Sequence, residues 1–440
     1  MTIFKAYDVR GIFGTEVTEE EARRIGMAFG SWAKGGKVCT GRDTRISGPS
    51  LQGELVKGIL STGCEVKSYG VVPIAILSFI TWKDGLFAAA YISASHNPPE
   101  YNGVRFRTGD GYGLLYQQTD IMMFYREGNF LKGQGQVVEN DAKEAVLRYA
   151  DYAKGKLRFK RRMNVVLDVG NGSASAAVPL YQKLGFNPIV LNAEMDGRFP
   201  GRGPAPGEKS LKAASRAVVE NGADYGMGFD PDADRGIVID DLGRVIPPEK
   251  VAIILARRRY HPGDLVIAGF DCSRILEDFL TPEGFNVRRE KVGDVFVANT
   301  VKDSGAVLGV ERSGHFFLPE FQYSDDPFAM SLALGEIISE DQRLSELVDQ
   351  IPDYPYVQKS VRIEGGQEAV ARAMKTLSRD LASLNPDTTD GLKVVTSDYS
   401  ALIRPSNTEP LIRLYVETTG GGPEGEAQRL EKMIRDAVMP

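Results

Sequence analysis

One arrangement of apolar and polar positions occurs three times along the chain. Each copy has an apolar run ending in a Gly- or Asp-rich turn, then an amphipathic stretch, a glycine and a second short apolar run. The copies begin at Val38, Asn164 and Leu265, and their second runs lie at 65–66, 188–190 and 286–287. Short buried strands that alternate with helices are typical of βαβ units. The pattern therefore predicts three related α/β domains in succession.

The C-terminal part of the chain has a different pattern. After Pro352 and Pro355 come a strand-like KSVRI, a helical stretch at 367–384, a short strand at 392–396, two β runs around RPSNTEP and a helix at 425–438. Two helices on one antiparallel sheet form an α+β layer. We therefore expect an α/β protein with three successive α/β domains and a C-terminal α+β domain, at residues 1–140, 141–243, 244–353 and 354–440.

Length and composition are those of an ordinary globular protein. The 440 residues predict roughly two to four domains. Charged residues make up 25% and hydrophobic residues 42%, which argues against a disordered chain. Lys plus Arg is 53 and Asp plus Glu is 59, a net charge of −6, so a nucleic-acid partner is not expected. A local basic pocket for a small anion remains compatible with this balance.

Three widely spaced cysteines, Cys39, Cys64 and Cys272, form no CxxC pair. A disulfide framework or a zinc site is therefore not expected, and a reducing cytoplasm fits. The start, MTIFKAYDVRG, has no apolar region of the kind found in signal peptides. The longest apolar stretch, 71–82, contains Pro73 and is too short to span a bilayer. We expect a cytoplasmic protein without a membrane partner.

The first segment with candidate chemistry is AAAYISASHNPPEYNG, an apolar strand that runs into a polar loop. Ser95 lies where the strand ends, a usual position for reacting groups in α/β folds. A simple turn rich in Ser, Asn and Pro is the alternative interpretation. A Ser-His-Asp hydrolase is disfavoured because the adjacent Ser95 and His96 do not readily point at each other. A GxSxG elbow is also missing from the sequence.

The second segment, DPDADR, has Asp230, Asp232 and Asp234 at alternate positions. Carboxylates this close repel one another and require a cation. A hard divalent ion with oxygen ligands is the natural partner. An EF-hand loop would need Gly and Glu where Arg235 and Asp241 stand, and the flanking segments resemble strands. A solvated acidic loop is the remaining alternative.

Two later segments have groups suited to a sugar phosphate. In GVERSGH, Glu311 and Ser313 next to glycine suit contact with vicinal hydroxyls, whereas a lone His315 is more often structural. The loop RPSNTEP combines guanidinium, hydroxyl and amide donors, which together can hold a phosphate. A β-hairpin with a polar tip is the alternative. The candidate anion-binding residues are Arg404, Ser406, Asn407, Thr408 and Arg413.

These four segments, in this order, resemble the α-D-phosphohexomutase family, which includes phosphoglucomutase, phosphomannomutase and phosphoglucosamine mutase. YDVRG at 7–11 and TGRDTRISG at 40–48 also match its N-terminal motifs, so the resemblance runs from Tyr7 to Arg413. It implies four domains around a central cleft. It also implies an isomerase that interconverts hexose 1-phosphate and hexose 6-phosphate through a phosphoserine and a 1,6-bisphosphate.

The resemblance implies a role for each matching residue. Ser95 is the phosphorylated serine and, with the three aspartates of DPDADR, a ligand of Mg²⁺; a hexose 1,6-bisphosphate serves as activator. Arg10, His96 and Arg105 complete the catalytic set. The implied substrate contacts are Arg235, Lys291, Glu311, Ser313, His315, Arg404, Ser406, Asn407, Thr408 and Arg413.

The sequence departs from the family pattern at two positions. Arg105 stands where the family usually has the lysine thought to handle the proton, and arginine stays protonated in proteins. Either Arg105 acts only electrostatically, another group takes the proton, or turnover is slow. Pro231 stands where glycine is common, which stiffens the metal loop without removing a ligand.

The expected partners are small-molecule hexose phosphates, with glucose and mannose favoured and phosphoglucosamine mutase activity as the alternative. A non-catalytic sugar-phosphate-binding paralogue is a less favoured hypothesis, since Arg105 makes it conceivable. A metal-dependent phosphatase is a third class and would release free phosphate. The sequence leaves a homo-oligomer open.

Overall fold

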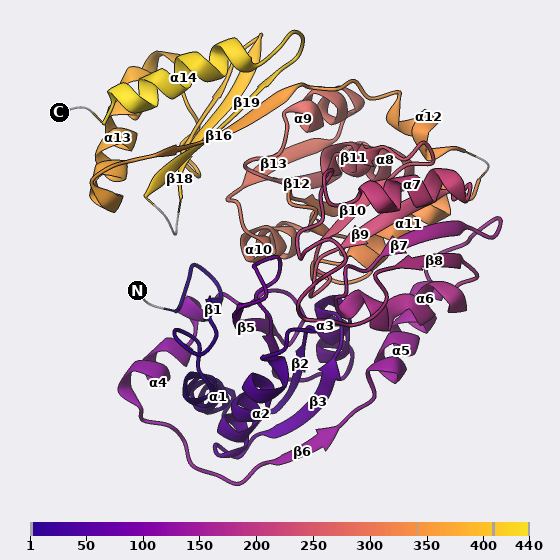
Figure 1. The fold of residues 1–440 in the computed structure, drawn as a ribbon, viewed down its shortest axis with the longest axis vertical. Helices are drawn as coiled ribbons and strands as arrows, with labels where there is room; N and C mark the ends of the chain where they lie inside the picture. Colours follow the sequence, from indigo (N-terminus) through magenta and orange to yellow (C-terminus); the bar gives the residue numbers. More distant parts are fainter. Residues whose placement is uncertain (1–2, 341, 407–409, 439–440) are drawn as a thin grey trace.

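The computed structural model describes residues 3–340, 342–406 and 410–438. In these ranges the chain forms four sheets, one after another along the sequence, each with its own helices (Figure 1). Three are α/β layers and the last is an antiparallel α+β layer, as the sequence predicts. Asn407 and Thr408, two of the expected phosphate-binding residues, lie outside the described ranges.

The first sheet has the order β1-β5-β4-β2-β3-β6. The parallel pairing of β2 with β3 around α2 confirms the first predicted βαβ unit. Thr18 caps α1 by accepting from the Glu21 amide, and three glutamates follow in the first turn. The elements are β1 Val9–Ile12, α1 Glu19–Ala33, β2 Lys37–Arg42, α2 Gly48–Leu60, β3 Glu65–Val71, α3 Ile74–Lys83, β4 Ala88–Ile92, β5 Tyr101–Thr108, α4 Ile121–Glu127, β6 Gln136–Glu139 and α5 Ala142–Lys154.

The second sheet has the order β11-β10-β9-β7-β8. Strands β7 and β8 run parallel, which confirms the second predicted βαβ unit. The DPDADR loop joins the antiparallel strands β9 and β10, so it is flanked by strands as expected. The elements are β7 Asn164–Asp168, α6 Val178–Lys183, β8 Asn187–Leu191, α7 Lys212–Glu220, β9 Tyr225–Phe229, β10 Gly236–Ile239 and β11 Val245–Ile246.

The third sheet has the order β13-β12-β14-β15. Strand β12 pairs in parallel with β13, which confirms the third predicted unit. The GVERSGH segment forms the turn between β14 and β15. The elements are α8 Pro248–Arg259, β12 Leu265–Gly269, α9 Ile275–Leu280, β13 Asn286–Glu290, α10 Asp294–Ser304, β14 Leu308–Val310, β15 Phe316–Phe317, α11 Pro327–Ile338 and α12 Leu344–Val348.

The fourth sheet, β16-β19-β18-β17, is antiparallel throughout and has a hydrophobic core of its own. In Figure 1 it lies at the upper left with α13 and α14 against it. The predicted helix at 367–384 is α-helical only to Asp380 and ends in a 3₁₀ turn. The elements are β16 Tyr356–Arg362, α13 Gly366–Asp380, β17 Leu392–Val395, β18 Tyr399–Pro405, β19 Leu411–Thr418 and α14 Glu424–Asp436.

The apolar stretch at 71–82 forms most of the central helix α3. Ile74 to Thr81 are all buried, and the helix belongs to the largest hydrophobic core together with α5, α8 and α11. A helix that is apolar on every side is typical of a protein interior. The Ile74 amide donates to the Asp232 carbonyl at 2.9 Å, so α3 also supports the acidic loop. No helix in the described ranges is both long enough and apolar enough to cross a membrane.

Candidate active site

Ser95 is buried at the end of β4, in the loop that connects this strand to β5. Its backbone has φ +48°, in the left-handed region that non-glycine residues seldom adopt. Its hydroxyl donates to Asp230 Oδ2 at 2.9 Å, across to the loop between β9 and β10. The serine of the first motif and the aspartates of the second therefore meet in one site.

The expectation that Ser95 and His96 do not point at each other is wrong. Ser95 Oγ lies 3.2 Å from His96 Nδ1, because the left-handed serine turns the backbone so that two consecutive side chains converge. Arg235, then burial and Arg10, lower the pKa of His96 to about 2, so its ring is neutral. Arg10, on strand β1, donates to Asn97 Oδ1 of the same loop at 2.7 Å.

Asp230, Asp232 and Asp234 are fully buried, and one carboxylate oxygen of each lies within 4.8 Å of the others. Burial, with the charges of Asp234 and Asp232, raises the pKa of Asp230 well above its usual range. Burial alone would also raise the pKa of Asp234, but Arg105 and His315 outweigh it and hold that pKa well below its usual range. The three carboxylates are thus shielded from water, and the pKa values of Asp230 and Asp234 shift in opposite directions.

The donor set of the triplet fits a hard divalent cation. Asp232 Oδ1 and Asp234 Oδ1 are buried and have no hydrogen-bond partner. An unsatisfied buried oxygen costs free energy, which a bound cation would remove. Carboxylates are the ligands that Mg²⁺ and Ca²⁺ prefer. The residues present could therefore hold such a metal.

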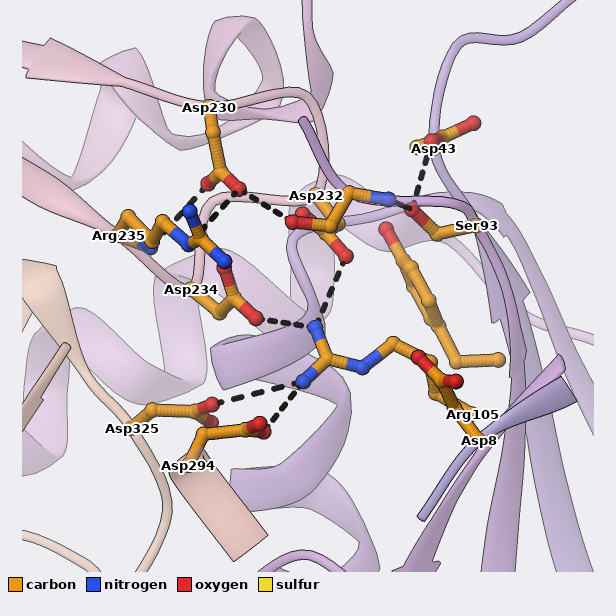
Figure 2. A network of polar contacts seen from close by, with 12 residues as sticks. Asp8, Asp43, Ser93, Arg105, Asp230, Asp232, Asp234, Arg235, Asp294 and Asp325 are labelled. Carbon is orange, nitrogen blue, oxygen red and sulfur yellow. Dashed lines mark hydrogen bonds and ion pairs between the residues drawn. The ribbon is translucent and has the colours of Figure 1, made fainter. Parts of the chain in front are cut away.

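Arg105 lies at the centre of a buried network of carboxylates (Figure 2). Its Nη1 donates to Asp232 Oδ2 at 3.1 Å and also to Asp234, and its Nη2 donates to Asp294. Asp325 Oδ2 lies 3.9 Å from the same Nη2. Because these neighbours outweigh the effect of burial, the pKa of Arg105 is raised well above its usual value. The guanidinium is a fixed positive charge, which agrees with a purely electrostatic role.

The GVERSGH turn lies directly beside the acidic loop. His315 Nε2 is 3.3 Å from Asp234 Oδ2, and His315 Nδ1 is 2.8 Å from Glu311 Oε2. Burial would lower the pKa of His315, but these two carboxylates outweigh it and raise the pKa well above its usual range. Ser313 Oγ also lies 2.8 Å from His315 Nδ1. Arg235 Nε approaches His315 Nε2 at 3.4 Å, so both segments share one polar cluster.

Lys291 lies on the loop that leads from β13 into α10. Its side chain is exposed. The two residues that follow it, however, form hydrogen bonds with two different domains. The Gly293 amide donates to Glu311 Oε1 at 2.7 Å, and the Val292 amide donates to Asp390 Oδ2 of the fourth domain at 3.1 Å. The residues directly after Lys291 therefore connect the GVERSGH turn with the fourth domain.

Arg404 and Arg413 are directly opposite each other on β18 and β19. Residues in this register point to the same face of the sheet, where two like charges repel each other unless an anion lies between them. Arg404 Nη2 lies 3.3 Å from Asp390 Oδ2, whereas Arg404 Nε is buried without a hydrogen-bond partner. The Ser406 amide donates to the Leu411 carbonyl at 2.9 Å and closes the described part of the loop.

A cavity of about 410 Å³ opens beside Arg235 and the GVERSGH turn. It lies where the second and third domains meet the segment that leads into the fourth. It is large enough for a small ligand. Its lining includes both charged and aromatic groups, among them Arg235, Lys250, Arg312, Ser313, Tyr354 and Tyr356.

Sequence reasoning missed several buried charged residues of the site. Asp294 and Asp325 pair with Arg105 and Arg107, and Asp43 and Arg45 lie beneath the serine loop. Arg45 is fully buried. Asp43 and Arg45 stand in TGRDTRISG, and Asp294 follows the candidate residue Lys291 by three positions, so a signal was available. Asp325 has no such marker.

The arrangement combines a buried alcohol, three carboxylates that could hold a cation, a cavity of about 410 Å³ and an arginine pair on the fourth sheet. An alcohol beside a divalent metal can carry a phosphoryl group, since catalysis of phosphoryl transfer depends mainly on positioning and charge stabilisation. The arginine pair can bind a second phosphate. The site is therefore suited to move a phosphoryl group within a small phosphorylated substrate.

Comparison with known protein families accounts for nearly the whole chain. It matches the alpha/beta/alpha domains I, II and III of phosphoglucomutase/phosphomannomutase at residues 1–129, 147–243 and 247–354. It matches the C-terminal domain of the same family at residues 361–437.

Individual relatives are similar over their full length. The chain is 35% identical to the phosphoglucomutase/phosphomannomutase of Thermococcus kodakarensis, over 94% of each sequence. It is 34% identical to the "Probable phosphoglucosamine mutase" of Methanopyrus kandleri, over 99% of this chain and 97% of that one. A crystal structure of a phosphoglucomutase/phosphomannomutase family protein from Burkholderia thailandensis superposes with a TM-score of 0.87 at 28% identity, covering 99% and 97% of the two chains.

Proposed function

The chain belongs to the phosphoglucomutase/phosphomannomutase family and is a phosphohexomutase, and on that premise we propose that it acts through phosphorylated Ser95 with glucose and mannose phosphates as favoured substrates. The observation that supports the nucleophile is the hydrogen bond of 2.9 Å from the Ser95 hydroxyl to Asp230. It places an alcohol directly at a site with the donors for a divalent cation.

In the proposed cycle, the phosphate of a hexose 1-phosphate binds to Arg404, Arg413 and the loop between them. The sugar O6 attacks the phosphoryl group on Ser95, giving a hexose 1,6-bisphosphate and the free serine. The bisphosphate turns over, so that its O6 phosphate enters the arginine site and its O1 phosphate returns to Ser95. Hexose 6-phosphate then leaves. Because one arginine site accepts either phosphate, Glu311 and Ser313 contact hydroxyls that are equivalent in both orientations.

The metal of the proposal is Mg²⁺, held by Asp230, Asp232, Asp234 and the seryl phosphate. When bound, it offsets the negative charge of the transferring phosphoryl group. Arg105 contributes a further fixed charge from between the aspartates and Asp294. A catalytic amount of hexose 1,6-bisphosphate phosphorylates the serine and starts the cycle.

Phosphoglucosamine mutase activity is the second candidate. Several relatives that match over nearly their whole length bear the name phosphoglucosamine mutase.

We also propose a cytoplasmic location, because the three cysteines are buried free thiols, as expected in a reducing compartment.

A panel of 1-phosphates of glucose, mannose and glucosamine tests the proposal. Each is assayed with Mg²⁺ and the matching 1,6-bisphosphate, and both hexose 6-phosphate and free phosphate are measured. We expect hexose 6-phosphate from glucose and mannose substrates and no net release of phosphate. Faster turnover of glucosamine 1-phosphate would favour the second candidate, whereas free phosphate as the main product would identify a phosphatase.

A further inference from the structure

Arg45 is a fully buried arginine directly beneath the loop that contains Ser95. Its Nη2 donates to the Ser95 carbonyl at 2.6 Å and to the Asn97 carbonyl at 2.7 Å. Its Nη1 donates to the carbonyls of Pro98 at 2.6 Å and Tyr101 at 2.8 Å. Three carbonyls of this loop and that of Tyr101, the first residue of β5, thus accept hydrogen bonds from one guanidinium.

The remaining donor of Arg45 anchors the group from the other side. Arg45 Nε donates to Asp43 Oδ2 at 3.1 Å, and Asp43 Oδ2 also accepts from Ser93 Oγ at 2.8 Å. Ser93 Oγ in turn accepts from the Ser95 amide at 2.8 Å. Arginine has five N–H groups in a rigid fork, and here each has an acceptor. The amide and the carbonyl of Ser95 are both held through this set of contacts.

The backbone that these contacts hold is strained. Ser95 has φ +48°, and a non-glycine residue in this region persists only where its surroundings impose the conformation. This conformation also brings the Ser95 hydroxyl to Asp230 at 2.9 Å. A loop released from Arg45 would relax toward ordinary φ values and move the hydroxyl away from the aspartates.

Arg45 itself is fixed by the second domain. Its guanidinium lies 5.2 Å from the centre of the Phe199 ring. The neighbouring Thr44 hydroxyl donates to the Asn171 carbonyl at 2.9 Å, and Asn171 follows strand β7. The support of the serine loop is therefore attached to the same domain that supplies the acidic triplet.

We propose that Arg45, with Asp43 and Ser93, is the positioning residue that holds Ser95 in its strained, transfer-competent conformation. The inference rests on the proposed function, because it concerns the phosphoryl acceptor named there. Arg45 touches only the backbone of the loop and acts through Ser95. It therefore governs the rate of phosphoryl transfer and leaves binding of the distant phosphate group unchanged.

The test is the phosphorylation of Ser95 by glucose 1,6-bisphosphate, followed in time by intact mass in wild type, Arg45→Lys and Ser93→Ala. Lysine keeps the charge beside Asp43 but has only three donors. We expect Arg45→Lys to slow phosphorylation about 100-fold, since a misplacement of about 1 Å is sufficient for such a loss. Ser93→Ala, which leaves the Arg45–Asp43 pair intact, should slow it about 10-fold. In both variants the final extent of phosphorylation and the KM for hexose 1-phosphate should match wild type.

Arg24→Lys is the matched control, because Arg24 lies in the same domain and also donates to a backbone carbonyl, that of Tyr125. It should phosphorylate at the wild-type rate. A reduced final extent with an unchanged rate in Arg45→Lys would mean that Arg45 only maintains the fold, and would overturn the inference. Wild-type rates of phosphorylation in both single variants, Ser93→Ala and Arg45→Lys, would overturn it as well. If the wild-type protein is not phosphorylated at Ser95 at all, the proposed function fails instead.

Discussion

The hydroxyl of Ser95 donates to Asp230 Oδ2 at 2.9 Å, although the two residues are 135 positions apart in the sequence. Ser95 follows strand β4 of the first sheet, and Asp230 follows strand β9 of the second. The contact joins two domains at one point and brings an alcohol to a cluster of carboxylates. The proposed chemistry depends on this relationship.

Ser95→Ala should abolish turnover, because it removes the hydroxyl that donates to Asp230 at the acidic triplet. We expect kcat to fall at least about 1,000-fold, the scale of loss seen when a nucleophile is removed. Binding of hexose 1-phosphate, measured by calorimetry, should persist. The exposed Ser397→Ala serves as control. Turnover of Ser95→Ala near the wild-type level would reject the nucleophile.

Removal of divalent metal with EDTA should stop turnover, and Mg²⁺ should restore it. Asp232→Asn should raise the Mg²⁺ concentration for half-maximal activity about tenfold or more, since affinity follows the charge of the ligand set. The exposed Asp398→Asn should behave as wild type. Activity that resists EDTA, or an unchanged Mg²⁺ requirement in Asp232→Asn, would contradict a metal at this triplet.

Arg105→Met should destabilise the protein, because Asp232, Asp234 and Asp294 would lose their shared counter-ion. Removing one partner of a buried ion pair costs about 3–5 kcal/mol, which denaturant unfolding can measure. Mg²⁺ should then raise the Tm of Arg105→Met more than that of wild type, as the bound ion replaces part of the lost charge. The exposed Arg372→Met is the control. If Mg²⁺ raises the Tm of Arg105→Met and of wild type by the same amount, Arg105 does not act as the counter-ion of these aspartates.

Arg404→Ala should weaken substrate binding more than catalysis. A charge-assisted hydrogen bond to a phosphate is worth about 1.5–3 kcal/mol, so KM should rise by about 10- to 150-fold. Arg362→Ala, an exposed arginine on β16 of the same sheet, is the matched control. Steady-state kinetics with hexose 1-phosphate give both constants. An unchanged KM would remove Arg404 from the phosphate site.

We expect the free energy of unfolding to depend on pH because of the buried carboxyl group of Asp271. Burial, together with Glu311, raises its pKa to about 6, above the ordinary 3.8. The folded state therefore binds a proton more tightly than the unfolded chain, and Asp271 lowers stability as pH rises from about 4 to about 6. Asp271→Asn removes this effect and should raise the free energy of unfolding at pH 7.5 by about 3 kcal/mol. The gain should disappear at pH 4; an equal gain at both pH values would contradict the assignment.

Local patterns predict much of the fold. The three βαβ units are recognisable because each strand is a short apolar run and each helix is followed within a few residues by a glycine, features that depend on neighbouring residues alone. The DPDADR triplet is recognisable for the same reason, since three close carboxylates imply a cation wherever the chain places them. The helix predicted at 367–384 ends early at Asp380, and the limits of elements are the part that local patterns predict least well.

The relationships between distant segments could not be predicted in the same way. The expectation for Ser95 and His96 failed because ordinary backbone angles were assumed, and the left-handed serine exists only where Arg45 and Ser93 hold it. The pairing of Arg105 with Asp294 could not be predicted either. Asp294 begins helix α10 of the third domain, and its pairing with Arg105 depends on how two sheets pack.

The amino-acid sequence alone determined the order of the domains, the kinds of chemistry present and the residues able to perform it, because residue type and close spacing are local properties. Tertiary structure decided which of these groups meet, which are charged, and which conformation the serine adopts. The reason is physical: pKa values, ion pairing and strained backbone angles all depend on burial and on neighbours supplied by other domains.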